Sequence, residues 1–316
     1  MSVLDAAGLA PRFRTRDEAA RATMGRPSSI ITTTVSSSAS TEPSDRQQLL
    51  LADCIAKNEP ILLRGVLSDW TPTKRWHDDE YLRATEPDAV LEPRRADVAS
   101  GRTSTQGDPY EREKPIGWPA LVDAVAEAAR KQENAPLYAA QVRVRTSLPH
   151  LFADTRPEPP CVAALGPVWR NAPSLYYGCG SKTPLHFDLL ENVLCVARGR
   201  KRVTLWHPED SEVLYPADDG AATFSRADVY APDLDAFPLL SEGLQRGAQV
   251  EVHAGDALYI PCCWWHAVST PRGECSMSVS YWAQQPAEKA WQPPEPDYNE
   301  EDGDDAEPPV GFSVTR

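Results

Sequence analysis

The sequence predicts a mainly β domain of the sandwich or barrel type, with helices before the β-rich region and a disordered tail at each end. Short apolar runs separated by turn residues fill residues 174–282, which is typical of such a domain. Helical spacing of apolar residues occurs only earlier in the chain, and both ends are polar or acidic. With 316 residues, of which 41% are hydrophobic, the chain can form one large domain with a sizeable core.

Residues 1–44 are expected to be a disordered tail. The stretch 32–38 consists almost entirely of Thr and Ser and cannot bury enough apolar surface to fold. Residues 19–41 contain Arg21 and Arg26 but no acid, so this part also resembles an organelle transit peptide. A disordered tail is the interpretation that we favour.

The ordered domain is expected to span residues 45–283 and to begin with helices. Apolar residues recur at helical spacing from about Arg46 to Ile55. An apolar run at 60–65, bounded by Pro and Gly, predicts a buried strand. Residues 119–132 predict an amphipathic helix with Pro119 in its first turn, and residues 138–144 predict a strand.

The catalytic barrel is expected at about residues 174–282. Two apolar runs within 192–206 flank Gly199 and predict a hairpin with this glycine at the tight turn. Further short strands are expected at 249–253, 257–260 and 277–282. Residues 284–316 are rich in Pro and acidic residues, so a second disordered tail is expected there.

Charge and cysteine usage limit the possible partners and compartment. The formal charge of −14 argues against a generally nucleic-acid-binding surface, which would be basic. The seven cysteines include no Cys-x-x-Cys pair, which fits reduced thiols in the cytoplasm or nucleus. No apolar run reaches the length of a transmembrane helix, so no membrane partner is expected.

His186 and Asp188 form the first part of a candidate metal site. Alternate side chains of a strand face the same way, so in a strand here the imidazole and the carboxylate point to one side and Phe187 to the other. A second histidine would complete a 2-His-1-carboxylate set, which binds non-haem Fe(II) and leaves positions open for ligands. The candidate is His266, which follows the short strand at 257–260. A structural core histidine beside two tryptophans is the alternative for His266.

His186-Phe187-Asp188, combined with GDALYIPCCWWH at 255–266, resembles the JmjC-type, cupin-fold 2-oxoglutarate hydroxylases. The resemblance extends back to the run at 60–65 and covers roughly residues 45–282. It implies a double-stranded β-helix (cupin or jelly-roll) barrel. It also implies that His186, Asp188 and His266 bind Fe(II), with 2-oxoglutarate as cosubstrate and O2 as oxidant.

The resemblance further implies residues that contact the cosubstrate. Lys201 would pair with the distal carboxylate of 2-oxoglutarate, since a dianion in a barrel needs a cationic partner. Rival cations on the same segment are Arg198, Arg200 and Arg202. The other implied contacts are Thr183, Tyr138, Asn192 and Ser280, the last standing where relatives often carry Asn.

By resemblance, the chain is expected to be an Fe(II)- and 2-oxoglutarate-dependent dioxygenase. A protein or peptide substrate is favoured by the acidic balance, and a wybutosine-type tRNA base is the alternative. A catalytically silent cupin that binds a ligand or partner protein is an alternative of another class, as is a cupin isomerase or sugar-binding protein. A monomer or weak dimer is expected, because Pro-rich acidic sequence stands where several relatives have dimer-forming helices.

Overall fold

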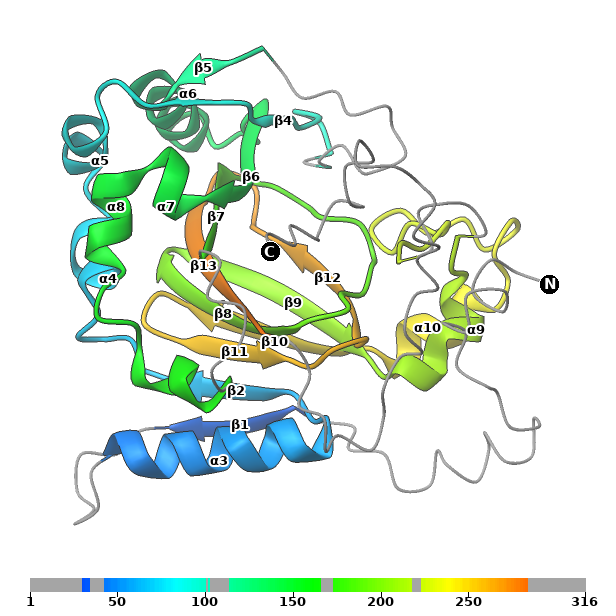
Figure 1. Cartoon of the computed structure of the whole chain (residues 1–316). Coiled ribbons are helices and arrows are strands. Elements are labelled where there is room, and N and C mark those ends of the chain that lie inside the picture. Colours follow the sequence, from blue (N-terminus) through cyan, green and yellow to red (C-terminus); the bar gives the residue numbers. More distant parts are fainter. Residues whose placement is uncertain are drawn as a thin grey trace, which may run out of the picture.

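Two β-sheets, with helices packed against the larger one, make up the chain as the computed structural model describes it (Figure 1). The described residues are 30–34, 43–100, 102, 114–165, 173–217 and 223–283. The larger sheet has the strand order β1-β2-β11-β8-β13-β7-β6-β4. Its strands are β1 (Ile31–Thr34), β2 (Ile61–Arg64), β11 (Ala257–Ile260), β8 (Glu191–Arg198), β13 (Cys275–Ala283), β7 (Ser174–Cys179), β6 (Leu137–Arg143) and β4 (Arg94–Arg95).

The smaller sheet is antiparallel and has the strand order β10-β9-β12. Its strands are β10 (Ala248–His253), β9 (Arg200–Trp206) and β12 (Trp265–Ser269). A separate two-stranded ribbon pairs β3 (Val90–Leu91) with β5 (Ile116–Gly117). The larger sheet and the smaller sheet face each other across a shared apolar core.

The helices that precede β7 cover the outer face of the larger sheet, and Figure 1 shows α3 beneath β1 and β2. Helices α9 and α10 lie beside the smaller sheet instead, where Trp206 of β9 donates to the Gly243 carbonyl of α10. Pro119 lies in the first turn of α6, and apolar side chains of this helix pack in one cluster with Leu175 and Tyr177 of β7. No helix in the described ranges is long and apolar enough to span a membrane. The helices are α3 (Pro43–Lys57), α4 (Thr71–Arg75), α5 (Asp79–Thr85), α6 (Trp118–Arg130), α7 (Val144–Ser147), α8 (Pro149–Asp154), η2 (Pro160–Leu165), η3 (Pro208–Asp210), α9 (Ser211–Leu214) and α10 (Leu240–Arg246).

Strand alternation separates the helix-facing core from the space between the sheets. On β8, Val193 and Cys195 belong to the cluster that includes the helices, whereas Leu194 and Val196 belong to the cluster shared with the smaller sheet. Asn192 has the parity of Leu194 and is therefore directed between the sheets. The mainly β architecture predicted from the sequence, with helices before the barrel, is confirmed.

The predicted hairpin at 192–206 is wrong. β8 belongs to the larger sheet and β9 to the smaller one, so the two runs do not pair with each other. Gly199 forms the corner between the sheets with a φ of +67°, and a Cβ there would come 1.9 Å from the Cys275 carbonyl oxygen. Only glycine fits this corner.

The expected tail of residues 1–44 also differs from the structure. Ile31–Thr34 form β1, which pairs in parallel with β2 along its whole length, and α3 already begins at Pro43. This strand is held by backbone pairing with a buried neighbour, so its low apolar content did not reveal it. The rest of that tail and residues 284–316 lie outside the described residues.

Candidate metal and cosubstrate site

One pocket between the two sheets brings together all eight residues predicted for the site. It is lined by His186, Asp188, His266, Lys201, Thr183, Tyr138, Asn192 and Ser280. They come from five strands and from the segment before β8. The pocket therefore unites residues that lie far apart in the sequence.

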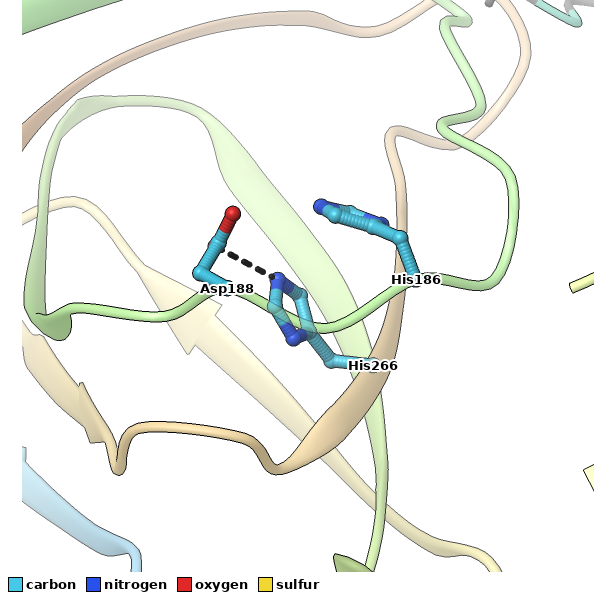
Figure 2. A group of neighbouring side chains, drawn as sticks. All are labelled: His186, Asp188 and His266. Carbon is cyan, nitrogen blue, oxygen red and sulfur yellow. Dashed lines mark ion pairs between the residues drawn. The ribbon is translucent and has the colours of Figure 1, made fainter. Parts of the chain in front are cut away.

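Three potential metal ligands meet in this pocket, and Figure 2 shows their side chains close together. Ligand atoms of His186, Asp188 and His266 all lie within 4.8 Å of one another. His186 and Asp188 were expected to lie on a strand, but the segment that carries them is not a regular strand. His186 instead forms isolated bridges to Phe224 and to His266. The alternation still holds, because Phe187 turns away and packs edge-on against Trp265.

Backbone carbonyls fix the orientation of both imidazoles. His186 Nδ1 lies 2.8 Å from the Pro184 carbonyl oxygen, and His266 Nδ1 lies 2.9 Å from that of Trp264. A carbonyl can only accept a hydrogen bond, so each Nδ1 carries the proton. In the neutral imidazole this tautomer leaves the lone pair on Nε2, which is the arrangement that metal-binding histidines show.

The electrostatics of the site favour ligand-competent protonation states. Burial lowers the pKa of His186 to about 4, so its imidazole is neutral at physiological pH. Burial alone would raise the pKa of Asp188, but the nearby imidazoles outweigh this and hold it below its ordinary value. Asp188 Oδ2 is buried 3.4 Å from His266 Nε2 (Figure 2) and has no hydrogen-bond partner among the described residues. A divalent cation fits this donor set.

Lys201 brings a buried positive charge to the pocket. It shares the parity of Val203 and Leu205 on β9, whose side chains lie in the core between the sheets. Only 2% of Lys201 is exposed, and burial lowers its pKa to about 8. Within the described residues it forms no ion pair, and its Nζ lies 5.8 Å from the centre of the Tyr138 ring. An uncompensated buried ammonium is costly, so a bound anion would stabilise it.

The three rival cations are bound elsewhere. Arg198 forms an ion pair with Asp79 of α5. Arg200 and Arg202 have the outward parity on β9 and pair with carboxylates on the surface of the smaller sheet, at Glu251 and Glu274. Lys201 is therefore the cation of this segment that faces the pocket.

The other predicted cosubstrate residues differ in how free their polar atoms are. Asn192 Oδ1 is buried and has no hydrogen-bond partner in the part of the chain that the structure describes, as expected of a group that awaits a ligand. Ser280 is buried on the inward face of β13. The Thr183 hydroxyl donates to the Val268 carbonyl and accepts from the Val268 amide, both at 3.1 Å. The single proton of this hydroxyl is thus already donated to the Val268 carbonyl. A carboxylate of the cosubstrate could accept it only by displacing that carbonyl.

The position of the Tyr138 ring depends on a glycine in the neighbouring strand β7. Its ring packs over Gly178 of β7, where a Cβ would lie 2.6 Å from the ring carbon Cδ2. The ring in turn lies against Lys201. Burial raises the pKa of the phenol, so the hydroxyl stays protonated and can donate a hydrogen bond.

Several pocket residues were not predicted from the sequence. The ring of Phe224 stacks on His186 at 5.4 Å between centroids and supports that ligand. Ser278 on β13 has a buried hydroxyl without a partner in the described chain, next in parity to Ser280. Alternation on β13 could have revealed Ser278. The other unpredicted lining residues include Arg94, Gln141, Tyr176 and Trp282.

Comparison with known proteins gives one family and several relatives. A family model described as a cupin-like domain matches residues 46–289. Lysine-specific demethylase 8 of Xenopus tropicalis is 26% identical over 72% of this chain and 48% of its own length. The bifunctional peptidase and (3S)-lysyl hydroxylase of Homo sapiens is 27% identical over 73% of this chain and 78% of its own. The tRNA wybutosine-synthesizing protein 5 of Mus musculus is 31% identical over 33% of this chain and 31% of its own. The chain spans between 19% and 55% of the length of the first three curated relatives it matches.

Proposed function

This chain belongs to the cupin-like domain family, and from that premise we propose that it is an Fe(II)- and 2-oxoglutarate-dependent dioxygenase that hydroxylates a protein side chain. The observation that carries the proposal is the pairing of the metal-ligand cluster with a buried lysine in one pocket. Metal ligands alone would suit many cupins. A buried ammonium without a carboxylate partner in the described residues adds the requirement for an anionic ligand.

Each member of the cluster has a defined part in holding the metal. His186 and His266 would bind Fe(II) through Nε2, and Asp188 through a carboxylate oxygen. Three protein ligands leave coordination positions for 2-oxoglutarate and O2. The bound iron supplies the chemistry by which one atom of O2 enters a substrate C–H bond and the other enters succinate, with release of CO2.

The remaining residues of the pocket bind and orient the cosubstrate. The ammonium of Lys201 would neutralise its distal carboxylate, with Tyr138 positioned to donate a second hydrogen bond. Asn192 and Ser278 offer buried polar atoms that have no hydrogen-bond partner among the described ranges. Leu194 and Ile260 supply apolar walls that exclude water from the site.

A protein substrate is supported by the names of relatives and by the acidic balance of the chain. Two of the relatives described above are named for action on lysine, one as a demethylase and one as a lysyl hydroxylase. The formal charge of −14 disfavours a polyanionic partner. A tRNA substrate is the second candidate, because another relative is named as a wybutosine-synthesizing protein.

Uncoupled turnover tests the proposed class. Purified protein with Fe(II), ascorbate, O2 and 2-oxoglutarate is expected to form succinate slowly without any substrate. His186→Ala should abolish this activity, whereas His253→Ala, on the outer surface of the smaller sheet, should retain it. Mass spectrometry of incubated proteins and tRNA then identifies which gains one oxygen. Absence of succinate from the wild type would favour a silent binding protein.

A further inference from the structure

Two cysteines face each other on β7 and β13, which lie side by side in the larger sheet (Figure 1). Cys179 ends β7, Cys275 begins β13, and the two residues are partners in the register of these antiparallel strands. Both side chains pack on the helix-covered face of the sheet. Ser278 and Ser280 of β13 point to the other face, into the pocket. The sheet therefore separates the two thiols from the pocket.

The hydrogen bonds of this strand pair place the two cysteines at a position of close approach. The Gly180 amide donates to the Glu274 carbonyl at 3.2 Å, so the next pair, Cys179 with Cys275, is a non-hydrogen-bonded pair. The Cys179 carbonyl accepts instead from the Ala135 amide, at 2.9 Å. Cα atoms of such a pair lie about 4.5 Å apart, within the range of about 4.4–6.8 Å that disulfides span. A bond between the sulfurs requires no change of register.

The two thiols have only weak interactions to lose on oxidation. Cys179 Sγ lies 3.3 Å from the Glu133 carbonyl oxygen, and Cys275 Sγ lies 3.7 Å from that of Val125. The thiols also hydrogen-bond each other. A thiol is a weak donor, so little stabilisation disappears when both protons leave.

Cys275 is the more reactive of the two thiols. It is partly exposed, whereas Cys179 is buried. The hydrogen bond from Cys179 holds the pKa of the Cys275 thiol below its ordinary value, and the Arg198 guanidinium acts in the same direction, against burial and Asp79. The same hydrogen bond and burial raise the pKa of Cys179. Because the thiolate is the form that attacks an oxidant, oxidation is expected to begin at Cys275.

Other cysteines come close together but are less accessible. The sulfurs of Cys262 and Cys263 are 3.4 Å apart, but these residues are adjacent in the sequence and both are buried. Cys161 and Cys195 hydrogen-bond each other and are also buried. Of the seven cysteines, all of which lie within the described residues, Cys275 is the one that is not buried. A dissolved oxidant can therefore reach the strand pair first.

We propose that Cys179 and Cys275 are a peroxide-reactive site, at which hydrogen peroxide forms a reversible disulfide between β7 and β13. The Cys275 thiolate attacks the peroxide and breaks its O–O bond, which gives a sulfenic acid and hydroxide, and the hydroxide takes up the thiol proton to form water. The Cys179 sulfur then attacks the sulfenic sulfur, so that the S–S bond forms and a second water leaves. Two thiols lose two electrons in total, the peroxide gains them, and a dithiol reductant reverses the reaction. This inference does not depend on the proposed function.

Peptide mapping of the full-length protein tests the site. Reduced protein, treated with EDTA to prevent reactions of iron with peroxide, would be exposed to hydrogen peroxide, blocked with iodoacetamide and digested with trypsin. Trypsin releases Cys179 within residues 171–182 and Cys275 within residues 273–289, each without another cysteine. Dimedone, which traps sulfenic acids, reports the first step. The variants are Cys275→Ala and Cys179→Ala, and the matched control is Cys54→Ala, at a buried cysteine of α3.

The wild type and Cys54→Ala should yield the two peptides joined, with a mass two hydrogens below their sum, and dithiothreitol should separate them. Oxidation should raise the midpoint of thermal unfolding by about 5–15 °C, because the bond constrains the unfolded chain. Cys275→Ala should lose both effects, whereas Cys179→Ala should accumulate the dimedone adduct on Cys275. Peroxide treatment of the wild type that leaves both peptides alkylated, joins Cys275 to a different cysteine, or joins the pair without raising the midpoint would overturn the inference.

Discussion

Replacing Lys201 with Met should weaken 2-oxoglutarate binding while leaving the barrel folded. Methionine has a similar length and no charge, so it fills the buried position but cannot pair with a carboxylate. A hydrogen bond to a charged group contributes about 1.5–3 kcal/mol. That free energy corresponds to an increase of about ten- to a hundred-fold in the KM for 2-oxoglutarate. Uncoupled succinate formation, measured over a range of 2-oxoglutarate concentrations, gives this KM directly.

The matched control is Arg202→Met, one residue further along β9. Arg202 points outward and pairs with Glu251, so its loss should leave the KM unchanged. Circular dichroism would show that both variants are folded. An unchanged KM in Lys201→Met, or an equal rise in both variants, would refute the assignment of the buried ammonium to the cosubstrate.

Three further results follow from the same pocket. Without cosubstrate, Lys201→Met should raise the free energy of unfolding at pH 7, measured by urea denaturation, by up to about 3 kcal/mol, since burial lowers the Lys201 pKa from 10.5 to about 8. The destabilisation caused by the buried Lys201 charge is fully present below pH 8 and is lost as pH rises from 8 to 10.5. If Lys201→Met does not raise the free energy of unfolding at pH 7, the lowered pKa of Lys201 is contradicted. In calorimetric titrations of the wild type, affinity for 2-oxoglutarate should fall as pH rises above about 8, because the carboxylate binds the protonated lysine; a flat profile from pH 7 to 9.5 would count against this pairing. Gly178→Ala should cost about 1–3 kcal/mol of stability in the same denaturation assay and raise the KM for 2-oxoglutarate, because its Cβ would collide with the Tyr138 ring. Gly117→Ala has space for its Cβ and lies outside the pocket lining, so it should leave the KM unchanged even though Gly117 is the N-cap of α6. An equal rise in KM for the two alanines would refute the steric argument.

Two residues of the site could be paired from local alternation, whereas His266 and Lys201 were implied by the resemblance to the cupin-fold hydroxylases. His186 and Asp188 are two residues apart, so an extended backbone directs both to one side whether or not a regular strand forms. In the structure Lys201 shares its parity with the apolar residues of β9, which distinguishes it from the arginines on either side. These relations need no knowledge of which strands pair.

Other parts of the site depend on contacts between distant segments. Arg94 reaches the pocket because β4, a strand of two residues, pairs with β6, and nothing in its own sequence signals this. The left-handed backbone of Gln141 is imposed by the register shift against β7, against its own preference. The hydrogen bond from the Thr183 hydroxyl to the Val268 carbonyl likewise joins two segments that are distant in the sequence, so the sequence alone could not predict it.

The errors in the predicted fold have the same origin. Two apolar runs around Gly199 suit a hairpin and a corner between sheets equally well, and the choice depends on which partners each strand finds elsewhere. β1 has little apolar content and becomes a strand through its pairing with β2.

Fe(II)-dependent binding of 2-oxoglutarate, measured without oxygen by isothermal titration, tests the central claim most directly. The wild type should bind 2-oxoglutarate tightly only when Fe(II) is present. His186→Ala should lose the effect of the metal, and Lys201→Met should lower the affinity at saturating Fe(II). Binding that is equally tight with and without Fe(II), or no binding in either case, would contradict the account.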